Sequence, residues 1–151
     1  MTGCPECGAP AEPHSCEELF HVVLALDHSR RPPRGPLHGV TVSCFLLQHP
    51  SRLPAPDRAR TWAILHAYVN EGLTAVTRLT EGMRRANSHQ NRAAALPDIV
   101  TGVPTPPLGP TPTAFSVTIN DVAQDGTFPA VGFPERVNAW ATATVAGWRS
   151  Q

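Results

Sequence analysis

The sequence predicts an all-α protein, a small helical bundle with an N-terminal zinc-knuckle-like segment and proline-rich connections. Three observations lead to this fold class. Apolar residues recur at spacings of three and four in several stretches, which is the period of an amphipathic helix. The 17 prolines stand mostly between those stretches, where they end helices. Three of the 4 cysteines fall within the first 16 residues, in and just after a segment without helical periodicity.

The length and composition fit a single domain over residues 1–151. A chain of 151 residues with 41% hydrophobic and 16% charged residues can bury a substantial core. We expect four consecutive parts within this domain. They are a zinc-stapled helical hairpin (1–50), a helical region (51–100), a proline-rich strap (101–133) and a C-terminal helix (134–151).

Two helices are expected in the hairpin, at about residues 16–28 and 37–49. Ser15 and Glu18 form a capping-box pattern ahead of an apolar face, which indicates the start of the first helix. The prolines and glycine of residues 30–36 interrupt the pattern and predict a loop. The second stretch is rich in β-branched residues near its start, so a strand is the alternative to a helix there.

Helical periodicity resumes after Asp57, which we expect to cap the third helix. Gly72 interrupts this stretch, so one long helix and two shorter helices both fit. Five prolines in residues 104–112 predict an extended strap of polyproline type. A short strand or turn should then lead into a short helix at Thr118. Pro134 opens the last helix, whose apolar face should dock onto the core.

The sharpest motif is Cys4-Pro-Glu-Cys7-Gly8, a turn that brings two thiolates to one point. The glycine lets the backbone curl and direct N–H groups at the sulfur atoms. Cys16 adds a third thiol at a helix N-terminus, where the helix dipole stabilises a thiolate. Thioredoxin-like enzymes share the spacing of the first two cysteines, but they carry it in a βαβ context that is absent here. The three cysteines therefore predict a metal site.

The topology of the hairpin indicates the fourth ligand. Two helices of similar length joined by a short loop run antiparallel, which places His49 beside Cys16. His49 is thus the expected ligand, and His21, His14 and Cys44 remain alternatives. A tetrahedral Cys3His set indicates Zn²⁺ in a closed, structural site that leaves no position for water. An iron–sulfur cluster would instead require Cys44 as a ligand.

Composition excludes several functions. All 12 basic residues are arginine, so the chain has no lysine for a Schiff base, a P-loop or a kinase-type active site. The formal net charge of zero argues against a nucleic-acid partner. No apolar run reaches the roughly 18–20 residues of a membrane span. We therefore expect a soluble, cytoplasmic protein whose cysteines stay reduced, without a membrane partner.

Four sequence features together resemble an uncharacterised bacterial family, a domain of unknown function. They are Cys-Pro-Glu-Cys-Gly-Ala at 4–9, Cys16 at the head of an apolar helix, the segment His38-Gly-Val-Thr-Val42, and Gln48-His49-Pro50. Members of that family begin with a CPxCG segment and a third cysteine. They continue with a histidine-headed helix that ends in Gln-His-Pro. The resemblance is strong over residues 1–50 and supports the metal ligands.

The same family implies no reaction, because it has no assigned activity. Its members often carry a tyrosine where Phe45 stands and an acidic residue where Ser43 stands. That departure weakens a catalytic interpretation of the second helix. The resemblance is looser around His66 and thin in the C-terminal third.

Two functional hypotheses follow. The first is a small zinc-binding protein with a structural Cys3His site that acts by binding another protein. It is favoured by the closed ligand set and by the absence of a recognisable catalytic motif. The alternative is a metal-dependent enzyme with a histidine-lined pocket near His38 and His66, with His28 as a further member. The number of histidines, 7 in the chain, favours this alternative, but no residue is assigned to catalysis.

Overall fold

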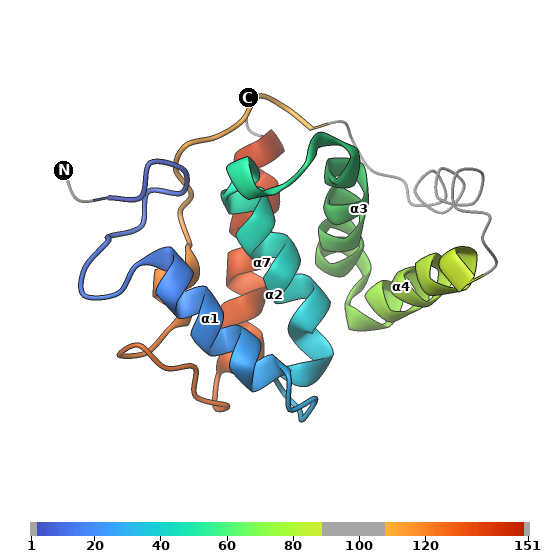
Figure 1. The fold of residues 1–151 in the computed structure, drawn as a ribbon, viewed down its shortest axis with the longest axis horizontal. Coiled ribbons are helices and arrows are strands. Elements are labelled where there is room, and N and C mark those ends of the chain that lie inside the picture. The colour runs from blue at the N-terminus through green and yellow to red at the C-terminus, as the bar shows by residue number, and fades with distance from the viewer. Residues whose placement is uncertain (1–2, 89–107, 150–151) are drawn as a thin grey trace.

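The computed structural model describes residues 3–88 and 108–149 and shows a helical bundle (Figure 1). No strand occurs among the described residues, so the predicted all-α class is confirmed. The remaining parts of the predicted helical region and proline-rich strap, residues 89–107, lie outside them. Short 3₁₀ turns occur at Gly35–Leu37 and Pro50–Arg52. The α-helices are α1 (Cys16–Asp27), α2 (His38–Gln48), α3 (Ala55–Glu71), α4 (Leu73–Ser88), α6 (Ile119–Val122) and α7 (Phe133–Arg149).

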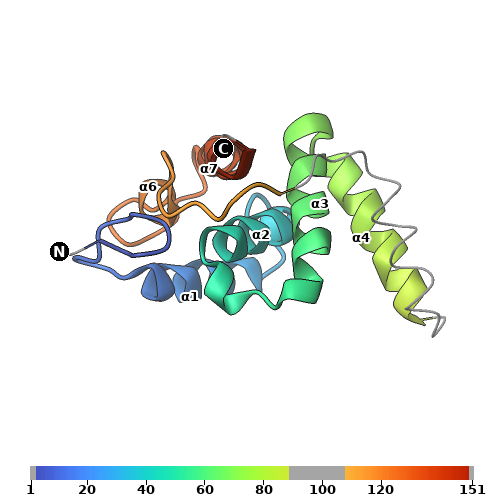
Figure 2. The same ribbon diagram turned by 90° about the horizontal axis from the view of Figure 1, so that it is seen from above.

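Helix α2 forms the centre of the bundle and packs against α1, α3 and α7 (Figures 1 and 2). Val40, Cys44 and Leu47 of α2 are fully buried. The helix forms in place of the alternative strand, because contacts on several sides bury its apolar and β-branched side chains. Helix α4 packs on α3 and lies at the outer edge of the bundle (Figure 2).

Helix α1 begins at the predicted capping box. The Glu18 backbone N–H donates to Ser15 Oγ at 3.1 Å, and the Ser15 N–H donates to the Glu18 carboxylate at 2.7 Å. These two bonds satisfy N–H groups that the first turn leaves without partners. Cys16 is consequently the first residue of the helix, with its thiol at the N-terminal end.

The third helical stretch is two helices, and its start differs from the prediction. Gly72 adopts φ +91°, a conformation that ends α3 and lets α4 leave in a new direction. The expectation that Asp57 caps this helix was wrong, because α3 begins at Ala55. Pro56 fits within the first turn, where its missing N–H costs nothing. Asp57 instead lies inside that turn, and its carboxylate accepts a hydrogen bond from Arg60 at 3.0 Å.

Helix α7 buries the apolar face that its sequence predicted. Val137, Trp140 and Trp148 are at most 1% exposed. The Trp148 indole Nε1–H donates to the carbonyl oxygen of Leu47 at 2.8 Å, which fastens α7 to the end of α2. No helix in the described part of the chain has both the length and the apolarity needed to cross a membrane.

The segment from residue 108 to α6 connects α7 with the N-terminal turn. The Gly109 N–H donates to the Trp148 carbonyl at 3.2 Å, and the Phe115 N–H donates to the Cys7 carbonyl at 3.1 Å. The short helix predicted at Thr118 is present as α6. Its first turn is closed by the Asp121 carboxylate, which accepts the Thr118 N–H at 2.9 Å.

Candidate metal centre

The side chains of Cys4, Cys7, Cys16 and His49 converge at one point. One ligand atom from each lies within 4.8 Å of all the others. The Cys7 and Cys16 sulfur atoms are 3.6 Å apart, far longer than the roughly 2.05 Å of a disulfide. Two thiolates on a tetrahedral zinc ion, each about 2.3 Å from the metal, would lie about 3.8 Å apart. The spacing excludes a disulfide and fits two ligands of one ion.

The cysteine turn has the tight backbone that its glycine allows. The Gly8 N–H donates to the Cys4 carbonyl at 2.9 Å, and the Cys4 N–H donates to the Ala9 carbonyl at 2.7 Å. Gly8 adopts φ +86°, which a residue with a side chain rarely does. The turn directs both thiols to the same side, with Cys7 buried and Cys4 half-buried.

His49 follows the last residue of α2 and is oriented by its own helix. Its Nδ1 lies 2.8 Å from the Phe45 carbonyl oxygen, so Nδ1 carries the proton and donates it. The imidazole also stacks on the Phe45 ring, with centroids 4.2 Å apart. Nε2 is buried and makes no hydrogen bond. A histidine that donates one ring N–H to a carbonyl and leaves the other nitrogen free is the usual form of a metal ligand.

Burial and mutual contacts shift the pKa values of the Cys7 thiol and the His49 ring. A hydrogen-bonding contact with the Cys16 thiol, together with burial, raises the pKa of Cys7 to about 12. Burial lowers the pKa of His49, but contacts with the Cys7 thiol and the Phe45 carbonyl outweigh this effect and raise it. The His49 Nε2 thus lies near the Cys7 thiol, although the geometry is not that of a hydrogen bond. The neutral thiol is favoured until a cation takes the place of its proton.

Contacts outside the ligand set hold the three contributing segments together. The Glu6 carboxylate accepts the Ser51 N–H at 3.0 Å and the Ser51 hydroxyl at 2.8 Å. Arg52 donates to the Glu17 carboxylate at 2.7 Å. These bonds join the cysteine turn and the start of α1 to the turn that follows α2. Sequence reasoning missed them, because the partners are 45 and 35 positions apart and no motif links them.

The alternative fourth ligands all lie outside this cluster. The His14 ring packs against Gly126, where an added Cβ would lie 2.5 Å from His14 Nε2. His21 is exposed on α1. Cys44 is fully buried in the core, and burial raises the pKa of its thiol. Among the candidates, only His49 meets the three cysteines.

The histidine pocket considered as an alternative site is only partly assembled. His38 and His28 line one pocket at the loop between α1 and α2, but His66 does not line it. His66 is buried in α3 beside Trp62, with ring centroids 5.3 Å apart, and its Nδ1 accepts a hydrogen bond from Asn70. His66 is therefore part of the core packing around α3.

The chain belongs to a family of unknown function, DUF5946, whose model matches residues 2–149. This match confirms the resemblance to an uncharacterised family that the sequence motifs suggested. No curated protein and no solved structure matches the chain. The comparisons thus establish the family and supply neither a reaction nor a ligand.

Proposed function

We propose that this member of a family without an assigned activity binds one Zn²⁺ through Cys4, Cys7, Cys16 and His49. The observation that carries the proposal is the buried, unpartnered Nε2 of His49 among three thiols. A buried polar atom without a partner costs about 1–3 kcal/mol, which coordination to a cation would recover. Thiolate and imidazole ligands in a tetrahedral set select zinc.

The zinc ion in this proposal is structural. Four protein ligands fill a tetrahedron, so no position remains for a water molecule or a substrate. The ligands come from the N-terminal turn, the first residue of α1 and the residue after α2. The ion would hold these segments together and stabilise the hairpin. Structural zinc sites contribute on the order of 10–16 kcal/mol of apparent binding free energy.

Native mass spectrometry of the full chain beside two cysteine variants tests this proposal. We expect one zinc per chain in the wild type. Cys7→Ser should lose the metal and, with it, the helical circular dichroism signal. Cys44→Ala is the matched control, because it removes a buried cysteine outside the cluster and should retain one zinc. Zinc retained at full stoichiometry by Cys7→Ser would rule out the site. Metal lost without unfolding would rule out its structural role.

We further infer that the protein acts in the cytoplasm by binding another protein. An apolar groove of about 410 Å³ supports this role; it lies between the loop before α2, the junction of α3 and α4, and the start of α7. Its lining includes Pro33, Leu37, Tyr68, Leu73 and Pro134. Rigid proline and aromatic surfaces of this kind suit an apolar segment of a partner, because little conformational entropy is lost on contact.

Photo-crosslinking in cells tests the partner. A photoreactive residue in place of Tyr68 should give a discrete adduct with another protein. The same residue in place of Arg78, which is exposed on α4 outside the groove, should not give it. Identical adducts at the two positions, or none at position 68, would contradict the proposed binding role.

A further inference from the structure

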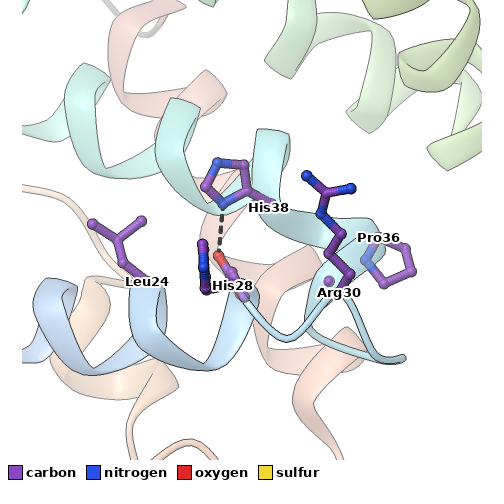
Figure 3. Close-up of a pocket in the computed structure, with 7 residues that line it drawn as sticks. Leu24, His28, Arg30, Pro36 and His38 are labelled. Atoms are coloured by element: carbon purple, nitrogen blue, oxygen red, sulfur yellow. Dashed lines mark hydrogen bonds and ion pairs between the residues drawn. The ribbon is translucent and has the colours of Figure 1, made fainter.

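A second cluster of chemically active side chains lies at the opposite end of the α1–α2 pair from the metal centre. Asp27 ends α1 and His38 begins α2. The eleven positions from His38 to His49 correspond to about 16 Å along the helix axis. The loop and the adjoining helix ends border an open pocket of about 580 Å³ (Figure 3). Its lining includes Leu24, Asp27, His28, Arg30, Pro36 and His38.

Asp27 is the buried centre of this pocket. Its side chain is 1% exposed, and one oxygen, Oδ2, accepts hydrogen bonds from His38 Nδ1 and Thr41 Oγ1, each at 3.1 Å. The other oxygen, Oδ1, is buried without a partner. Burial raises the pKa of Asp27, and the contact with His38 lowers it in part. A carboxylate placed here costs several kcal/mol of desolvation.

The carboxylate fixes the orientation of His38. Because Asp27 accepts the Nδ1 proton, the His38 imidazole turns its Nε2 away from α1 (Figure 3). The His38 side chain remains 54% exposed, so a ligand can reach Nε2. Asp–His pairs of this form orient an imidazole toward a ligand or a reacting group.

Arg30 is held at the rim by a tightly closed loop. It adopts φ +60°, an uncommon and strained conformation for a residue other than glycine. The Arg30 N–H donates to the Asp27 carbonyl at 2.9 Å. The backbone of Arg30 also lies against Gly35, where an added Cβ would come within 2.5 Å of the Arg30 Cα. The loop thus places the guanidinium beside the same pocket as His38 (Figure 3).

The hydrogen-bonding groups of the lining indicate the ligand class. His28, Arg30 and His38 carry ring or guanidinium N–H donors, while the one acid, Asp27, is buried and already accepts from two donors. A metal ion is not favoured here, because the cysteine–histidine cluster is the only grouping of ion ligands among the described residues. Leu24 and Pro36 add apolar surface that suits the carbon part of a small molecule.

We propose that this pocket binds the anionic group, a carboxylate or a phosphate, of a small molecule. Arg30 and the doubly protonated ring of His38 bind the anion. His38 then donates Nδ1–H to Asp27 and Nε2–H to the anion, and Asp27 is the positioning residue that holds the ring. The proposal does not depend on zinc, because the pocket and the metal centre share no residue.

Nitrogen-edited NMR of the histidine rings tests the proposal on the full zinc-loaded chain. Inorganic phosphate and acetate are titrated separately, with chloride at matched ionic strength as the reference. We expect saturable shifts of the His38 and His28 resonances with at least one of the two anions, while His21, exposed elsewhere on α1, stays unchanged. The anion that saturates identifies the ligand as a phosphate or a carboxylate.

Variants of the two exposed binding side chains test their roles, with folding checked by circular dichroism. His38→Gln and Arg30→Gln should each weaken the saturating anion by about tenfold or more, the effect of losing one charge-assisted hydrogen bond. Arg31→Gln is the matched control, since Arg31 is an exposed neighbour that does not line the pocket. Absence of saturable shifts, shifts reproduced by chloride, or equal weakening in Arg30→Gln and Arg31→Gln would each overturn the proposal.

Asp27→Asn tests the positioning role through the tautomer of His38. Without anion, the ring nitrogen shifts of neutral His38 should move from the Nδ1–H form toward the Nε2–H form that free histidine prefers. Anion affinity should also fall, because the amide carries no charge that stabilises the doubly protonated ring. A purely structural Asp27 would leave the tautomer unchanged in a variant that stays folded and zinc-loaded. That result would remove Asp27 from the proposal.

Discussion

At the scale of residues, Phe45 determines which ring nitrogen of His49 is free to bind a metal ion. The Phe45 carbonyl lies one turn before His49 and takes its Nδ1 proton, while the Phe45 ring stacks on the imidazole and on Phe20. Both contacts fix the ring before any ion is bound. The stack also explains why a phenylalanine serves at position 45, where it supplies a carbonyl and a flat surface and needs no polar group.

The role of His49 is tested by its truncation. His49→Ala removes one ligand and should weaken zinc by more than about 100-fold, beyond the 10–100-fold cost of changes around a ligand. Competition with a coloured zinc chelator measures the affinity. His21→Ala is the control and should match the wild type, because His21 is exposed and outside the cluster. Equal affinities of the two variants would remove His49 from the ligand set.

Buried His66 should make the free energy of unfolding depend on pH. Burial lowers the pKa of His66 below the value of about 6.5 that is usual for histidine. The unfolded chain therefore binds more protons than the folded chain just below pH 6.5, and stability falls as the pH falls through this window. His66→Gln can still accept the Asn70 hydrogen bond but cannot be protonated.

The measurement for His66 is the urea midpoint at saturating zinc, from pH 7.5 down to 5.5. We expect His66→Gln to gain stability relative to the wild type as the pH decreases below 6.5. A constant difference between the two proteins over this range would contradict the assigned shift. Zinc release affects both proteins alike, so it does not enter the difference.

At the scale of elements, a helix boundary was predictable from the sequence where a local motif defines it, and was not predictable where it depends on packing. The Ser15–Glu18 pattern identified the start of α1, because a capping box depends only on neighbouring residues. The start of α3 was misplaced, since Pro56 and Asp57 both suit a first turn and the sequence does not rank them. Whether Gly72 ends a helix depends on the packing of α4 against α3, which a periodicity analysis does not contain.

Two glycines should respond oppositely to alanine. Gly72→Ala forces a Cβ into the left-handed region at φ +91° and should destabilise the protein by about 1–2 kcal/mol. Gly39 lies within α2, and an added Cβ there meets no atom within 4 Å. Gly39→Ala should therefore stabilise by about 0.5–1 kcal/mol. Urea denaturation measures both, and the same sign for the two variants would contradict the conformations described.

For the whole molecule, the metal cluster was predictable and its surroundings were not. Three cysteines lie within 13 positions, so their chemistry is visible in the sequence. His49 required one tertiary argument, the antiparallel course of α1 and α2. The Glu6–Ser51 and Asp27–His38 pairs required the actual packing, because acids and their partners are too common for spacing to single them out.

Gln48 joins three distant parts of the chain. It is fully buried and donates to the Val117 carbonyl at 2.9 Å and to Thr144 Oγ1 at 2.8 Å. Gln48→Ala should destabilise by about 2–4 kcal/mol, because buried acceptors lose their donor. Gln124→Ala, at an exposed position, is the control and should be neutral. Denaturation with zinc content monitored checks this, and a loss below about 1 kcal/mol would contradict a bridging role.

The α1–α2 hairpin carries a pair of interacting residues at each of its two ends. Eleven positions separate Cys16 from Asp27, and eleven separate His38 from His49. Eleven residues make about three helical turns, so Cys16 and Asp27 lie on one face of α1, while His49 directly follows α2 at the end opposite His38. One end pairs Cys16 with His49, and the other pairs Asp27 with His38. Inserting or deleting one residue in either helix rotates one end of that helix by about 100° relative to the other end. A change in the length of either helix would therefore separate the residues of one of the two pairs.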